Sequence, residues 1–260
     1  MRGSSNCLLA LPTSHLLDRF GGGQGTPGSG SAAALLGSVA SSILIGSGKL
    51  ACLRAKPNES LRREECGLLV ETLKRRHAPA LKRFVDLDSE LFDGVLEARR
   101  KRDAARAPRM KQHHGRIALR RLQGCTELLI DIAEECIEVA KIGWTLFNLG
   151  FRPARGEPAT AVAAAVAGAQ SAILVALINL SSFRGGAWAV SIKNKCMALW
   201  QSALEMLEKS VACVAGIREE AEIALGAPQQ MDLLGLLGAK PRQFARRSTK
   251  VRARRRLRAA

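Results

Sequence analysis

The stretch TPGSGSAAALLG, residues 26–37, joins a loop of Pro, Gly and Ser directly to a helix of small apolar residues. The first amides of a helix have no partner within it, and the helix dipole draws anions and polarised carbonyls to that end. Glycines let a ligand approach the backbone closely because no Cβ stands in the way. This junction is therefore the best candidate for a ligand site, the alternative being an ordinary flexible connector.

Helical periodicity and capping signals continue on both sides of the junction. Aromatic residues make up only 4% of the chain and no alternating strand pattern is present, which favours an all-α bundle of long antiparallel helices. A proline at position 79 should kink or interrupt the third helix, and a basic break is expected over residues 99–109. We expect helices over residues 14–20, 31–55, 60–98, 110–149, 159–180 and 186–216, the last with an extension to 225.

Charge separates the end of the chain from the rest. The formal net charge is +17, and ten basic residues with no acid follow position 239. Such a segment repels itself, so we expect a helical domain over residues 1–230 and a disordered basic tail over residues 231–260. Residues 240–260 would contact polyanions such as nucleic acid non-specifically. The alternative is a solvated tail that merely sticks to other molecules non-specifically.

The sequence gives little support for a metal site, a disulfide framework or a membrane span. The seven cysteines are scattered singly and the four histidines have no metal-ligand spacing, so we expect no metal site, no disulfide framework and a cytoplasmic protein. Residues 159–180 are apolar enough to raise the question of a membrane span. Their many Ala and Gly residues favour a buried helix at a close interface, and no membrane span is expected.

Three motifs resemble the cyclodeaminase/cyclohydrolase family, which includes the cyclodeaminase part of formiminotransferase-cyclodeaminase and stand-alone methenyltetrahydrofolate cyclohydrolases. The first motif consists of Leu16–Phe20, a glycine-rich spacer and the run from Pro27 to Ala34. In the family the loop at the start of that run reads Pro-Gly-Gly-Gly-Ser, and this chain differs from it at Ser29. The resemblance covers residues 14–216. It assigns a loop to the folate substrate, formed by Pro27, Gly28, Ser29, Gly30 and Ser31.

The second motif, DLDSELF at residues 86–92, is similar to the family's Asp-x-Asp-Ala-x-Ala-Phe. Its second aspartate, Asp88, is the preferred catalytic acid or base, and Asp86 is held in reserve. A carboxylate inside a bundle can act as a general base toward water and can stabilise a cationic carbon. The alternative is a solvated helix face, because residues two apart do not share one face.

The third motif lies toward the other end, where Glu157 and Asn179 match family positions that would orient the folate. An asparagine in an apolar helix must find hydrogen-bond partners, so Asn179 could instead join two helices. The chain has Phe151, Glu157 and Val175 where the family has Asn, Asp and Asn. These departures alter polar positions that would touch the ligand.

The resemblance implies an enzyme of one-carbon folate metabolism. It would hydrolyse 5,10-methenyltetrahydrofolate to the 10-formyl form, or deaminate 5-formiminotetrahydrofolate to the methenyl form, with the folate as substrate and no other cofactor. Ala- and Gly-rich helix faces and the family both suggest a homodimer. The alternative is a family member that kept the bundle, lost the chemistry, and acts as a binding or structural protein through its basic tail.

Overall fold

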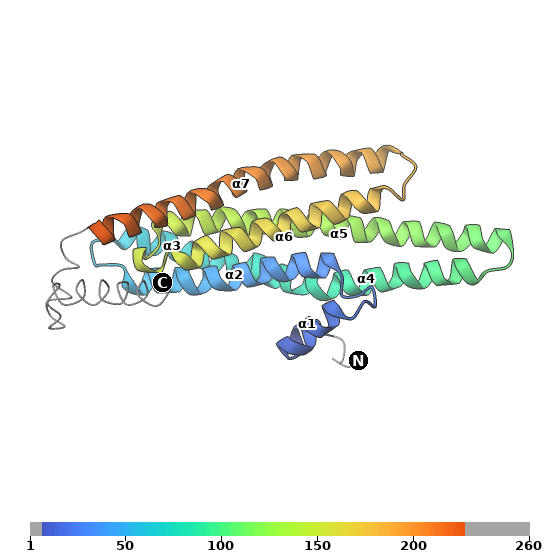
Figure 1. Ribbon diagram of the computed structural model, residues 1–260, viewed down its shortest axis with the longest axis horizontal. Helices are drawn as coiled ribbons and strands as arrows, with labels where there is room; N and C mark the ends of the chain where they lie inside the picture. The colour runs from blue at the N-terminus through green and yellow to red at the C-terminus, as the bar shows by residue number, and fades with distance from the viewer. Residues whose placement is uncertain (1–6, 227–260) are drawn as a thin grey trace, which may run out of the picture. The chain divides into compact units, whose positions relative to one another are not determined.

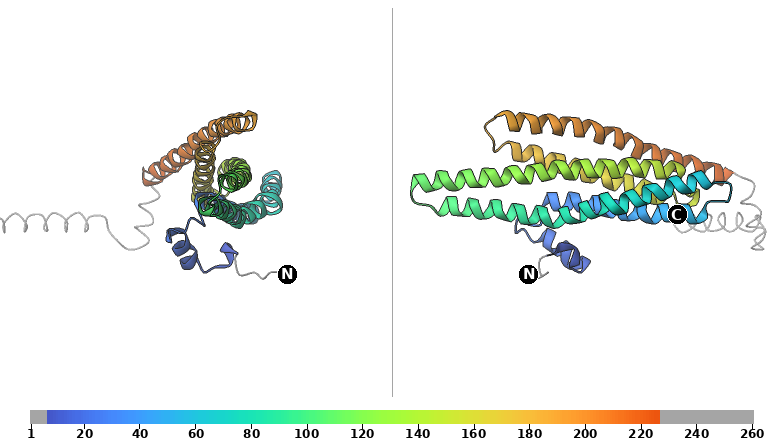
Figure 2. Two further views of the ribbon diagram at one scale, coloured as in Figure 1. Left: turned by 90° about the vertical axis from the view of Figure 1, so that its right-hand side faces the viewer. Right: turned by 180° about the vertical axis from the view of Figure 1, so that it is seen from behind.

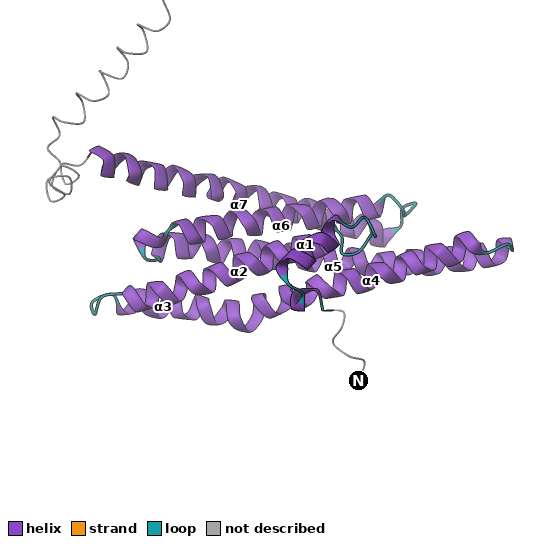
Figure 3. Ribbon diagram, turned by 60° about the horizontal axis from the view of Figure 1, so that its bottom comes forward, coloured by secondary structure: helices purple, strands orange, loops and turns teal. Residues whose placement is uncertain are grey.

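The computed structural model describes residues 7–226, and this part of the chain is helical without any strand (Figures 1 and 3). The all-α prediction is therefore confirmed. The chain divides into two units, Met1–Cys213 and Val214–Ala260, and the division falls within the last helix. The predicted boundary at residue 230 and the basic tail lie outside the described residues.

Seven α-helices and three short turns make up the described chain. The helices are α1 Thr13–Gly21, α2 Ser29–Arg54, α3 Ser60–Thr72, α4 Ala78–Ala104, α5 Pro108–Leu149, α6 Gly156–Leu180 and α7 Ala187–Gly226. The turns are the 3₁₀ turns η1 Leu8–Ala10 and η3 Arg152–Ala154 and the π-helical turn η2 Leu73–His77. The predicted helices match these elements, with differences of a few residues at most ends.

Two prolines decide where α4 and α5 start. The predicted interruption at Pro79 is the π turn, which precedes the first turn of α4, because a proline cannot donate the usual backbone hydrogen bond. The predicted basic break over residues 99–109 is wrong in extent, since α4 continues to Ala104. Arg, Lys and Ala are good helix formers, and the true break comes just before Pro108.

The small residues of α2 allow the neighbouring helices to pack unusually close to it. A Cβ on Gly37 would lie 2.6 Å from the Cys136 sulfur in α5 and 2.9 Å from a methyl carbon of Leu81 in α4. Gly168 of α6 packs as closely, because a Cβ there would lie 2.8 Å from the carbonyl oxygen of Ala33. The core of the first unit therefore forms around α2, and α4 and α6 run antiparallel to it (Figure 2).

This register leaves one pair of helices longer than the others. Gly30 near the start of α2 lies beside Asp88 in the middle of α4, so α4 continues about 24 Å further to Ala104 at 1.5 Å per residue. The first turns of α5 accompany it, and this α4–α5 hairpin extends past the start of α2 and the end of α6 (Figures 1 and 2). The end of the four-helix region thus lies partway along α4 and α5.

Two described segments are long and apolar enough to cross a membrane by length and composition. They are Ser29–Arg54 and Arg152–Leu180, with mean hydropathy values of 1.5 and 2.2. Half of each segment's most apolar window is buried inside the protein. The core helices of a bundle meet the same criterion because they contact other helices instead of water.

Candidate functional site

A cavity of about 310 Å³ lies where α2 begins and α6 ends. That volume is in the range of small-molecule binding sites. Four segments line it: the glycine loop with the start of α2, and one face each of α4, α5 and α6. The lining residues are Gly25, Gly28, Ser29, Gly30, Asp88, Phe92, Cys125, Leu129, Val175, Ile178 and Asn179.

Three helices contribute residues to this cavity at the same spacing. Asp88 and Phe92 lie four residues apart on α4, as do Cys125 and Leu129 on α5 and Val175 and Asn179 on α6. Residues four apart share one face of a helix. The cavity is therefore apolar over most of its wall, and its polar groups are restricted to the α2 loop, Asp88 and Asn179.

The carboxylate of Asp88 is the central polar group. Its side chain is 7% exposed, and its Oδ2 accepts hydrogen bonds from the Ser31 backbone N–H at 2.7 Å and the Ser31 hydroxyl at 2.9 Å. Burial raises the pKa of the Asp88 carboxyl above its ordinary value, and the two hydrogen bonds from Ser31 oppose that shift. Asp88 forms no salt bridge with any residue between 7 and 226. It is thus a buried acid whose charge no cation among these residues offsets in a salt bridge.

The glycine loop is fixed above this carboxylate. A Cβ on Gly30 would lie 2.5 Å from the Asp88 Cγ, so only glycine fits there. The hydroxyl of Thr26 donates to Asp93 of α4 at 2.7 Å and ties the loop to that helix. Neither the Ser29 amide nor the Gly30 amide donates to another described residue, so the two amides can bind an electronegative ligand atom.

Two further lining residues, Cys125 and Asn179, differ in the chemistry that they can offer a ligand. Burial, and then the nearby Asp88 charge, raise the pKa of the Cys125 thiol to about 11. That thiol is therefore protonated and weakly nucleophilic at neutral pH. The side chain of Asn179 forms no hydrogen bond with a described residue, which leaves its amide able to donate to and accept from a ligand.

The structure brings most of the predicted site residues together. Gly28, Ser29, Gly30, Asp88 and Asn179 line the cavity, and Ser31 holds Asp88 from behind it. Pro27 is buried in the adjoining loop but does not line the cavity. For Asp88, the solvated-face alternative is wrong, because the side chain is buried.

Two predicted residues lie elsewhere. Asp86 accepts hydrogen bonds from the Leu8 backbone N–H at 2.6 Å and the Cys7 thiol at 3.2 Å, so it holds the N-terminal segment against α4. Glu157 is exposed in the first turn of α6, 22 residues before Asn179. At 1.5 Å per residue it lies about 33 Å from Asn179, too far to share the cavity of this chain.

One apolar residue of the cavity wall, Val175, was predicted at a ligand-contacting position, because it stands where the family has Asn. The others were not predicted as site residues, because they occupy core positions in the periodic pattern of their helices: Phe92, Cys125, Leu129 and Ile178. The signal that could have found them is the four-residue spacing from Asp88 and Asn179, which places a neighbour on the same face.

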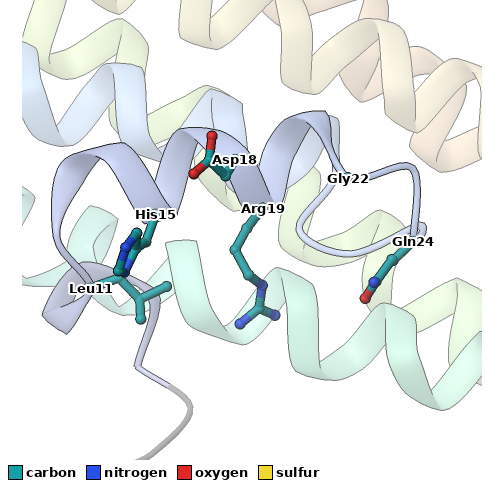
Figure 4. Close-up of a pocket in the computed structure, with 6 residues that line it drawn as sticks. All are labelled: Leu11, His15, Asp18, Arg19, Gly22 and Gln24. Carbon is teal, nitrogen blue, oxygen red and sulfur yellow. The ribbon is translucent and has the colours of Figure 1, made fainter.

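A second cavity, of about 370 Å³, lies beside α1 and is lined by Leu11, His15, Asp18, Arg19, Gly22 and Gln24. Figure 4 shows Arg19 and Gln24 extending to one side of α1 and Asp18 to the other. Its charged side chains are all exposed, unlike Asp88. Within residues 7–226 no group of three or more His, Cys, Asp or Glu side chains could hold a metal ion.

Comparisons with known proteins agree with this arrangement. The structure is similar to that of formiminotetrahydrofolate cyclodeaminase from Thermotoga maritima, with a TM-score of 0.69 and 16% sequence identity over 81% of this chain and 98% of that one. No curated protein matches the chain in sequence. The model of the formiminotransferase-cyclodeaminase family matches residues 12–198, a span that contains the whole cavity. The chain therefore belongs to the formiminotransferase-cyclodeaminase family.

Proposed function

We propose that the chain is an enzyme of one-carbon folate metabolism that exchanges groups at the carbon joined to N5 and N10 of tetrahydrofolate. It either hydrolyses 5,10-methenyltetrahydrofolate to the 10-formyl form or closes 5-formiminotetrahydrofolate to the methenyl form with release of ammonia. The observation that carries the proposal is Asp88, a buried carboxylate in a ligand-sized cavity that forms no salt bridge within residues 7–226. Both reactions pass through a positively charged carbon, which such a carboxylate stabilises.

In the hydrolysis, Asp88 takes and returns a single proton. A water oxygen adds to the bridging carbon and gives a proton to Asp88. The bond from that carbon to N5 then breaks, N5 keeps the electron pair and takes the proton from Asp88, and the remaining hydroxyl proton leaves to solvent as the formyl carbonyl forms. The raised pKa of Asp88 brings its proton affinity nearer to neutral pH, which suits both transfers.

In the deamination, the bridge between N5 and N10 forms instead of opening, and Asp88 again takes and returns one proton. N10 attacks the protonated formimino carbon and passes its proton to Asp88. Asp88 returns that proton to the departing nitrogen, which leaves as ammonia, and the methenyl cation remains. The free amides of Ser29 and Gly30 and the side chain of Asn179 provide donors for the folate's carbonyl groups. Neither reaction needs a metal or redox cofactor. We further propose that the enzyme is cytoplasmic.

The proposal extends to a homodimer. On α6, Leu174 is 53% exposed and Ile178, which also lines the cavity, is 68% exposed one turn later. On α7, Val190, Met197, Leu207 and Val211 are also exposed. Large apolar side chains at helical spacing suit a second copy of the chain. Sedimentation equilibrium should give twice the chain mass, and the mass of one chain at micromolar concentration would contradict this extension.

Turnover of both substrates tests the function. The full chain and its Asp88→Asn and Asp86→Asn variants are mixed with each folate, and the near-ultraviolet absorbance of the methenyl form is followed. The two variants make the same chemical change two residues apart, one inside the cavity and one outside it. We expect Asp88→Asn to lose at least about 100-fold in turnover and Asp86→Asn to keep most of it.

Two results would go against the proposal in different ways. Equal turnover by both variants would keep the enzyme and reject Asp88 as its acid or base. No turnover of either folate by the unaltered chain would reject the enzyme and favour the alternative, a family member that binds without catalysis.

A further inference from the structure

The α4–α5 arm, residues 94–121, carries most of the positive charge that the basic tail does not. It holds ten basic and two acidic residues, a net charge of +8. The ten basic residues from position 240 onward account for a further +10 of the total of +17. The net charge of all the rest of the chain is therefore −1, and the arm is a separate basic surface.

Most of the arm's cations have no acidic partner in the part of the chain that the structure describes. Glu97 pairs with Lys101 at 2.7 Å and with Arg121 at 3.6 Å, and Asp103 pairs with Arg102 at 2.8 Å. The other seven cations form no ion pair with any residue in the described part of the chain: Arg99, Arg100, Arg106, Arg109, Lys111, Arg116 and Arg120. Six of them, all except Arg99, are exposed. Their charge is available to a partner.

Three of these arginines form a line along α5. Arg109, Arg116 and Arg120 are seven and four residues apart, so they lie within about 40° of one another around the helix. They span eleven residues, or about 16 Å. Phosphates follow one strand of a DNA duplex at about 3.4 Å along its axis, so the line can face about five of them.

The composition of the arm favours phosphate over a lipid surface. Eight of its ten cations are arginine, whose planar group binds phosphate through two parallel hydrogen bonds. An interfacial membrane helix needs a broad apolar face. The arm contains no Phe, Tyr or Trp, and its exposed large apolar side chains are Met110 and Leu119.

We propose that the α4–α5 arm binds the phosphate backbone of nucleic acid. The surface is distinct from the cavity, whose lining residues Phe92 and Cys125 lie just outside the arm on the same two helices. Binding is electrostatic and insensitive to base sequence, because the line of arginines is positioned by a helix face and includes no other recognition element. The proposal does not depend on the enzymatic activity.

The test measures the salt dependence of binding by the full chain. The probe is a fluorescent DNA duplex of about 20 base pairs, and anisotropy gives Kd between about 50 and 200 mM salt. The arm variant carries Arg109→Ser, Arg116→Ser and Arg120→Ser. The matched control carries Arg252→Ser, Arg254→Ser and Arg255→Ser, which removes the same charge from the tail. A third variant places lysine at the three arm positions.

We expect the arm variant to reduce the slope of log Kd against log salt by about 3, one for each lost phosphate contact. The lysine variant should keep the slope, because it keeps the charge, and circular dichroism should show equal helix content in all variants. An unchanged slope in the arm variant, with the loss confined to the tail variant, would overturn the proposal. So would competition by polyglutamate or phosphatidylserine vesicles as strong as that by unlabelled duplex at equal charge.

Discussion

Gly30→Ala is the substitution whose effect follows most directly from the geometry of the site. The added Cβ would lie 2.5 Å from Cγ and 2.8 Å from Oδ2 of Asp88, so the carboxylate must move. Movement breaks both hydrogen bonds from Ser31, and bonds to a charged group contribute about 1.5–3 kcal/mol each. The higher helix propensity of alanine offsets about 1 kcal/mol of this loss in unfolding free energy. We therefore expect a net loss of about 2–5 kcal/mol in unfolding free energy.

Gly46→Ala in the same helix is the matched control, because a Cβ there would meet nothing within 4 Å. It should raise the unfolding free energy by up to about 1 kcal/mol. Thermal unfolding followed by circular dichroism should place Tm of Gly30→Ala at least about 4 °C below that of the unaltered chain. Folate turnover should fall with it, because the carboxylate is displaced. Equal Tm and equal turnover for the two variants would refute the close approach of Gly30 to Asp88.

Three more outcomes follow from the same contacts. Because burial raises the folded-state pKa of Asp88 above its unfolded value of 3.8, ionisation of Asp88 destabilises the fold as pH rises. The Asp88→Asn variant should therefore unfold at a higher urea concentration than the unaltered chain at pH 7. The difference should vanish below about pH 4, where the carboxyl is protonated in both states. Gly168→Ala forces a Cβ to within 2.8 Å of the Ala33 carbonyl oxygen, and urea unfolding should show a loss of about 1–3 kcal/mol. Glu157→Gln should leave kcat and KM for the folate unchanged, and a large rise in KM would show that this helix end reaches a cavity.

The helices and the α2 loop could be predicted from the sequence because local signals determine both. Proline positions, capping residues and apolar periodicity depend on neighbours within one or two turns. The end of α4 was harder to predict from the sequence. A run of Arg and Lys looks like a break, but these residues form helix well when a second helix packs beside them. The assignment of Asp88 over Asp86 came from the family motif, and burial supplies its physical reason.

The composition of the cavity wall could not be predicted in the same way. Cys125 and Val175 are far apart in the chain and meet only because α5 and α6 pack beside the start of α2. Glu157 shows the converse, since the third family motif grouped it with Asn179 although one continuous helix separates them by nearly its full length. A helix fixes distances within itself rigidly, while distances between helices depend on packing that the motifs do not encode.

The most direct test of the account is a crystal structure of the chain with 5-formyltetrahydrofolate, a stable compound that carries a one-carbon group on N5. We predict that this ligand lies between the α2 loop and Asn179, with its formyl carbon within about 3.5 Å of an Asp88 oxygen. The amides of Ser29 and Gly30 should donate to it. A ligand bound in the cavity beside α1, or one that leaves Asp88 untouched, would contradict the assignment of Asp88 as the acid and base.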